Sequence, residues 1–135
     1  MANALYAKAK EALLEGLLDL TDDSIKVALV RSTYVVNLSS HQYYSDIASH
    51  VAATSSVLSD RTTNNGIFDA DNITIEDYGT SGFNYIIIFK DTGNSATSRL
   101  IAYIDTAAGL PVSSSSSTIS VTINWSDTVS KIFSL

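Results

Sequence analysis

The sequence predicts a mainly β fold, either an antiparallel β-sandwich or a closed barrel, with one amphipathic α-helix at the N-terminus. Apolar residues recur with a helical period only near the N-terminus, and from about residue 24 onward they alternate with polar residues in short runs separated by turn-forming residues. A chain of 135 residues can bury roughly two-thirds of the surface that it exposes when unfolded. We therefore expect a single β-rich domain over residues 1–135.

The N-terminal segment, about residues 2–18, predicts the helix. It is rich in Ala, Leu, Lys and Glu, which favour helical structure. Four of its apolar residues are spaced by four positions and share one face of this helix: Leu5, Ala9, Leu13 and Leu17. Such a face packs either on the protein's own sheet or on a partner, and both alternatives are open. Within this segment we take as candidate interface residues Leu5, Tyr6, Leu13 and Leu17.

The first predicted strand covers residues 25–30, where Ile25, Val27 and Leu29 alternate with their neighbours. The pattern is ambiguous from residue 32 to residue 56, although residues 39–44 are compatible with a short helical turn capped by a serine. Tyr43 and Tyr44 are the best loop candidates for an interface. Packing inside the protein and a glycan site are the alternatives for this tyrosine pair.

The centre of the sheet is predicted from residues 83–89, which are apolar on both strand faces. Residues 100–104 form the expected return strand of an antiparallel hairpin. Another hairpin is predicted at Asn65-Gly66, because both residues tolerate a positive φ, and a strand is expected at residues 73–75.

The C-terminal part predicts an exposed loop around the serine run at residues 113–117. A half-buried strand is expected at residues 119–125, where apolar and polar residues alternate strictly. A short final strand is expected at residues 131–135.

Charge and composition disfavour nucleic-acid and membrane partners. The 8 Lys and Arg residues are scattered and are outnumbered by 14 Asp and Glu residues, for a formal net charge of −6. Phosphate backbones repel such a chain. Glu11, Glu15 and Asp19 interrupt the apolar residues of the N-terminus, so we expect neither a signal sequence nor a membrane anchor there. The chain has no cysteine, which excludes disulfides and thiolate metal sites.

The search for catalytic motifs predicts no enzyme and no cofactor. His41 and His50 lack a known metal-ligand spacing, and the loop at residues 79–82 lacks the G-x-S-x-G pattern of a serine hydrolase. Asp69 and Asp71 resemble the start of a calcium loop, but Ile73 and Thr74 occupy positions where a ligand and a glycine are needed. We therefore expect an ordinary Asx turn there and no metal site.

Several blocks of the sequence resemble small structural proteins of tailed-bacteriophage virions. The opening residues 1–14 carry this resemblance, and so do residues 25–30, 68–71, 98–105 and 109–111. The resemblance implies a non-enzymatic virion component that is made in the cytoplasm of a bacterial host and decorates or cements the capsid shell. The implied partners are the major capsid protein or other virion proteins, together with copies of the chain itself in a homo-oligomer, of which a trimer is one form.

Two alternative functions stay open beside capsid decoration. A neck or tail component would share the same sequence features and would differ in its copy number per particle. A host-glycan-binding module would use exposed tyrosines together with the Asp69–Asp71 turn to hold a sugar.

Overall fold

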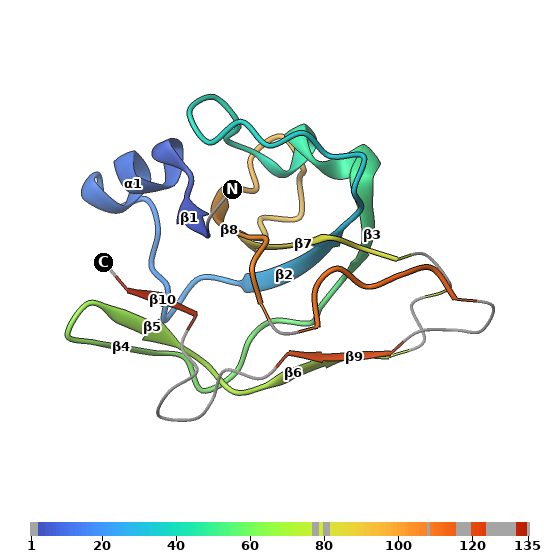
Figure 1. Ribbon diagram of the computed structural model, residues 1–135. Coiled ribbons are helices and arrows are strands. Elements are labelled where there is room, and N and C mark those ends of the chain that lie inside the picture. Colours follow the sequence, from blue (N-terminus) through green and yellow to red (C-terminus); the bar gives the residue numbers. More distant parts are fainter. Residues whose placement is uncertain are drawn as a thin grey trace.

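The computed structural model describes residues 3–76, 79, 82–107, 109–115, 120–123 and 132–134 (Figure 1). Its largest element is a five-stranded antiparallel sheet with the strand order β1-β8-β7-β2-β3. These strands are, in chain order, β1 (Ala4–Leu5), β2 (Ile25–Val30), β3 (Val51–Thr54), β7 (Tyr85–Lys90) and β8 (Leu100–Ile104). The predicted hairpin of β7 and β8 lies at the centre of the sheet, as expected from its apolar residues.

Two smaller antiparallel sheets complete the β structure. One has the order β10-β5-β4 and the other pairs β6 with β9. Their strands are β4 (Thr62–Asn64), β5 (Ile67–Asp69), β6 (Ile73–Ile75), β9 (Val121–Ile123) and β10 (Phe133–Ser134). The fold is thus mainly antiparallel β with one short N-terminal helix, as predicted, and the sheets of the described residues do not close into a barrel.

The sheets share one hydrophobic core. In Figure 1 the smaller sheets lie on one side of the five-stranded sheet, and the segment from residue 31 to residue 50 lies on the other. Phe68 of β5, Ile75 of β6 and Ile123 of β9 are buried in the same cluster as β2 and β7. Residues 86–89 of β7 are all buried, which confirms that this strand is covered on both faces.

The turn predictions are confirmed where the structure describes them. Asn65 and Gly66 have positive φ angles of 51° and 77° and join β4 to β5. The predicted strand at residues 119–125 is present as β9 (Val121–Ile123), and residues 119, 124 and 125 lie outside the described residues. The same holds for residues 116 and 117 of the serine run and for residues 131 and 135 of the predicted last strand, which is present as β10.

The predicted bounds of the N-terminal helix are wrong. The helix α1 covers only Ala7–Leu14, because the residues before it form β1 and pair with β8 in the register Ala4 to Tyr103 and Leu5 to Ala102. The side-chain oxygen of Asn3 accepts hydrogen bonds from the backbone N–H groups of Asp105 and Thr106, both 2.9 Å long, which hold the chain extended.

The C-terminal end of α1 is set by a glycine. Gly16 has a φ of 74°, and its N–H donates to the carbonyl of Leu13 while the N–H of Leu17 donates to that of Ala12. This pair of bonds is a Schellman motif, which ends a helix at a residue with positive φ. Leu17 therefore lies beyond the helix, and the stripe predicted from Leu5 to Leu17 does not exist as one helical face.

Short 3-10 helices occupy the ambiguous segment. They are η1 (Tyr44–Asp46) and η2 (Ala48–His50). The predicted helical turn thus begins at Tyr44, and its cap is not a serine: the carboxylate of Asp46 accepts hydrogen bonds from the backbone N–H groups of Gln42 and Tyr43.

Candidate functional site

The six residues predicted as interface candidates do not lie together in the structure. Tyr6 lies in the core with no exposed surface. Leu5 is half-buried in β1, Leu13 is half-buried on α1, and Leu17 is partly exposed beyond the helix. Tyr43 and Tyr44 are half-buried next to the turn between β7 and β8.

Tyr6 belongs to a buried chain of hydrogen bonds. Its hydroxyl lies 3.0 Å from the hydroxyl of Tyr34, which lies 2.7 Å from Nδ1 of His41. The backbone N–H of Asn37 also donates to this Nδ1, so the nitrogen is an acceptor and the hydroxyl of Tyr34 donates to it. Tyr6 therefore donates to Tyr34. Burial, together with the bond to Tyr34, raises the pKa of Tyr6 far above its ordinary value and keeps it a neutral donor.

The end of α1 presents apolar side chains to solvent. Leu14 is 90% exposed and Leu17 is 44% exposed, and Leu13 is half-buried and packs against the core. On the loop after β2, Val35 is 82% exposed. We call Leu13, Leu14 and Leu17 the helix-end surface.

Tyr43 and Tyr44 have different surroundings although they are adjacent. Tyr43 pairs with Arg99 in an isolated antiparallel bridge, and the guanidinium of Arg99 lies 5.4 Å from the centre of the Tyr43 ring. The ring of Tyr44 packs on Phe89 of β7 at a centroid distance of 4.9 Å. Tyr44 thereby reaches a cleft that Tyr43 does not line.

This cleft has a volume of about 310 Å³ and lies at one end of the five-stranded sheet. The strands contribute Lys26, Thr54 and Phe89, and η1 contributes Tyr44. The rest of the lining comes from the turn between β7 and β8: Asp91, Gly93, Asn94, Ser95 and Ser98. Lys26 pairs with Phe89 in the sheet register, so both lie on the sheet face that carries Tyr44. We call this feature the Tyr44 cleft.

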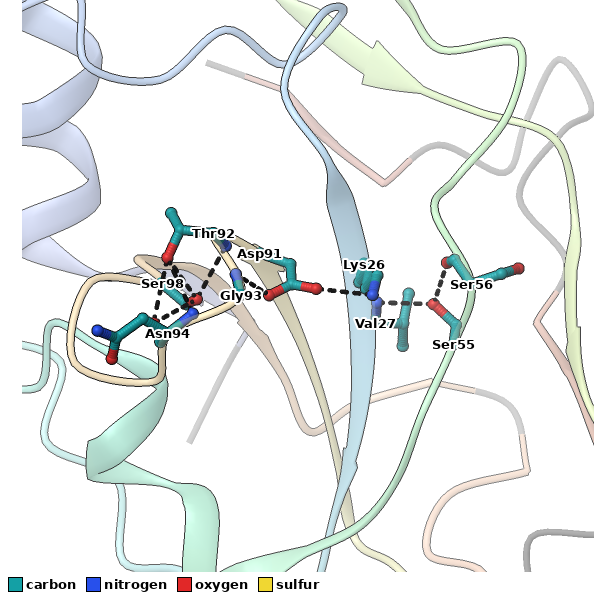
Figure 2. Close-up of polar contacts among 9 residues, drawn as sticks. All are labelled: Lys26, Val27, Ser55, Ser56, Asp91, Thr92, Gly93, Asn94 and Ser98. Carbon is teal, nitrogen blue, oxygen red and sulfur yellow. Dashed lines mark hydrogen bonds and ion pairs between the residues drawn. The ribbon is translucent and has the colours of Figure 1, made fainter.

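Two residues of the cleft lining, Lys26 and Asp91, form an ion pair (Figure 2). Nζ of Lys26 lies 2.7 Å from Oδ2 of Asp91, and about a quarter of each side chain is exposed. The other oxygen of Asp91 accepts a hydrogen bond from the N–H of Gly93. The hydrogen bond from Lys26 is the main cause that lowers the pKa of Asp91, and the bond from Gly93 adds to it. The carboxylate is therefore held ionised and neutralises the lysine.

Hydrogen bonds within the turn at residues 91–98 hold this part of the cleft lining in place. The buried hydroxyl of Ser98 accepts a hydrogen bond from the N–H of Thr92 and donates to the carbonyl of Asn94, as Figure 2 shows. The side-chain oxygen of Asn94 accepts a hydrogen bond from the N–H of Ala96. These bonds fix the turn, so the polar groups that it offers to the cleft are pre-positioned.

Several polar groups of the Tyr44 cleft remain available. Within the described part of the chain, the hydroxyls of Tyr44, Thr54 and Ser95 make no hydrogen bond to another protein group. The same is true of the amide nitrogen of Asn94. Burial, with a smaller contribution from Asp91, raises the pKa of Tyr44, so its hydroxyl keeps its proton.

Sequence reasoning identified Tyr44 but missed Lys26, Phe89 and Asp91. The available signal was the single charged residue inside the apolar run at residues 25–30, together with an acid directly after the run that ends at Lys90. Only the antiparallel register of β2 and β7 brings these two positions together.

The Asp69–Asp71 turn lies apart from the Tyr44 cleft and contributes none of its lining. Asp69 accepts a hydrogen bond from the N–H of Ala70, a local turn contact. Partial desolvation, followed by the nearby charge of Asp60, raises the pKa of Asp71. No group of three or more His, Asp or Glu side chains placed to hold a metal ion occurs among the residues that the structure describes.

No helix in the described ranges has both the length and the apolar character needed to cross a membrane. Comparisons with family models, with curated proteins and with solved structures find no match for this chain.

Proposed function

We propose that this chain is a non-enzymatic structural protein of a tailed-bacteriophage virion and decorates the capsid shell through protein–protein contacts. The blocks that carry the sequence resemblance supply the framework of the fold: β1 with α1, β2, the end of β5, and β8. These blocks are framework elements, so side-chain exposure is what indicates the contact surface.

The observation that carries the proposal is the helix-end surface. A leucine that is 90% exposed contributes nothing to the core, whereas burying it against a partner stabilises a complex by about 1.5–3 kcal/mol. Leu13 and Leu17 lie close to Leu14 in the chain and enlarge the apolar area. A stable contact with a capsid protein or with another copy of the chain needs roughly 800 Å² on each partner, so this surface would form the centre of a larger interface.

The proposed assembly is a homo-oligomer, with a trimer as the first form to test, seated on the major capsid protein. Linkage in an oligomer lets modest interfaces give strong attachment, because one bound subunit raises the effective concentration of the other subunits at neighbouring capsid sites.

The first test is quantitative mass spectrometry of purified virions. Hundreds of copies, in a simple ratio to the major capsid protein, would support decoration. A ring-sized number, about six to twelve copies, would instead identify a neck or tail component. Absence from the particle would refute the virion proposal.

The second test is a binding assay with particles that lack the protein. Leu14→Asp and Leu17→Asp together place two charges on the helix-end surface, and we expect binding to fall strongly while the fold is kept. Lys10→Glu is the matched control, because Lys10 is also an exposed residue of α1 but is not apolar. Equal binding of both variants would show that the helix end is not the contact.

A further inference from the structure

We propose that the Tyr44 cleft is a binding site for a neutral saccharide. This site is separate from the helix-end surface and does not depend on the chain being a virion protein. It rests on the shape of the cleft, its aromatic wall, its available hydroxyl groups and its balanced charge.

The aromatic wall gives the site its apolar contact. Tyr44 packs on the buried ring of Phe89 with the ring planes tilted by 46°, so the half-buried ring of Tyr44 is held in a fixed position in the lining of the cleft. The C–H faces of a pyranose ring are apolar, and a rigid aromatic ring can bury them at low entropic cost.

The polar groups match the hydroxyl groups of a sugar. Tyr44, Thr54 and Ser95 each offer a hydroxyl that can donate and accept, and Asn94 offers an amide N–H. They come from three separate elements of the lining, namely η1, β3 and the turn between β7 and β8. A ligand with several adjacent hydroxyls can satisfy all of them, whereas a purely apolar ligand would leave them unpaired.

The charge of the cleft selects a neutral ligand. Lys26 is the cation of the lining and Asp91 is its acid, and they neutralise each other at 2.7 Å. An anionic ligand would have to compete with Asp91 for the lysine and would approach a chain of formal net charge −6. A neutral sugar can instead bind to the edge of the ion pair, since Lys26 keeps further N–H groups and a carboxylate accepts several hydrogen bonds.

The size of the cleft agrees with a small sugar. Its 310 Å³ lies at the lower end of the range for small-molecule sites, roughly 300–1,000 Å³. One sugar ring fits this volume, and the open side of the cleft leaves room for a chain to continue. We expect a dissociation constant of about 1 mM for a single monosaccharide.

The test is an NMR titration of the ¹⁵N-labelled full-length chain with D-glucose, N-acetyl-D-glucosamine and L-rhamnose, and separately with sialic acid and inorganic phosphate. We expect at least one neutral sugar to cause saturable shifts confined to residues 26, 44, 54 and 91–98. The double variant Thr54→Val with Ser95→Ala removes two hydroxyls and should weaken that binding by about tenfold. Thr62→Val is the control, because Thr62 is an exposed strand threonine of β4 outside the cleft.

The proposal is overturned if none of the three neutral sugars gives saturable shifts at these residues. It is also overturned if phosphate or sialic acid binds more tightly there, which would identify an anion site. Unchanged affinity of the double variant would show that the sugar binds elsewhere.

Discussion

Replacing Tyr34 by phenylalanine is expected to destabilise the protein more than replacing Tyr6, although the second side chain is the more deeply buried. Tyr34 accepts a hydrogen bond from Tyr6 and donates one to His41, so its loss leaves the buried hydroxyl of Tyr6 without a partner. An unpaired buried hydroxyl costs about 1–3 kcal/mol, in addition to about 1 kcal/mol for the lost bond to His41. We expect Tyr34→Phe to lower the free energy of unfolding by about 2–4 kcal/mol.

Tyr6→Phe removes only the terminal donor, because Tyr34 keeps its bond to His41. The expected loss is about 0.5–1.5 kcal/mol. The double variant no longer contains the orphaned hydroxyl of Tyr6, so its loss should be about 1–2 kcal/mol smaller than the sum of the single losses.

Urea denaturation followed by circular dichroism measures all three variants. Tyr85→Phe is the control, since the hydroxyl of Tyr85 makes no hydrogen bond within the described residues and the ring contacts are kept. Additive losses, or a Tyr6→Phe loss equal to that of Tyr34→Phe, would refute the proposed order of donors and acceptors.

Three further predictions concern pH and backbone packing. Burial raises the pKa of Tyr6 and of Tyr103, so both side chains contribute fully to the stability of the fold below the unfolded-state pKa of about 10, and this contribution is lost as pH rises above it. Tyrosinate absorbance should show these two tyrosines ionising only as the protein unfolds. The hydrogen bond from Lys26 lowers the pKa of Asp91, so the ion pair stabilises the fold above the unfolded-state pKa of about 3.9, and this stabilisation is lost as pH falls through the folded-state pKa. Asp91→Asn should lower the free energy of unfolding by about 1 kcal/mol at neutral pH and leave it unchanged in strong acid. Gly82→Ala should destabilise the protein by about 1–3 kcal/mol in thermal unfolding, because a Cβ there would lie 2.7 Å from the backbone nitrogen of Ser114.

Each of these experiments has a control and a result that contradicts it. Ionisation of all tyrosines in the folded protein near pH 10 would contradict the first. Asp22→Asn changes an exposed acid outside the cleft and should leave stability almost unchanged; a loss with Asp91→Asn that persists in acid would contradict the second. Ser114→Ala keeps the backbone contact of Gly82 and removes only a side-chain bond 3.3 Å long; if it destabilises as much as Gly82→Ala, backbone crowding is not the cause.

The sequence was most informative where a residue's local pattern determines its structure. The alternation in residues 25–30 predicted β2 with its observed bounds, the apolar residues 83–89 predicted β7, which covers Tyr85–Lys90, and Asn65-Gly66 forms the expected turn. The helix bounds could not be read in the same way. Ala4 and Leu5 are good helix formers, but the edge of β8 supplies backbone partners that no local rule contains.

The candidate site was predicted less well than the fold. Tyr44 was selected as a loop aromatic and does line a cleft, whereas Tyr6 was selected from its position in the predicted helix and lies in the core. The pair of Lys26 and Asp91 depends on the register between strands whose residues are far apart in the sequence. Local patterns specify faces and turns, but a site made by several strands needs their alignment.

The pairing of β1 with β8 also determines when this protein can fold during its synthesis. Asn3 and Asp105, which fasten that pair, are 102 residues apart. The partner of β2 in the centre of the sheet, β7, likewise leaves the ribosome long after it. The nascent chain therefore carries unpaired strand edges until most of it has been made, and its folding should be slow and governed by long-range contacts.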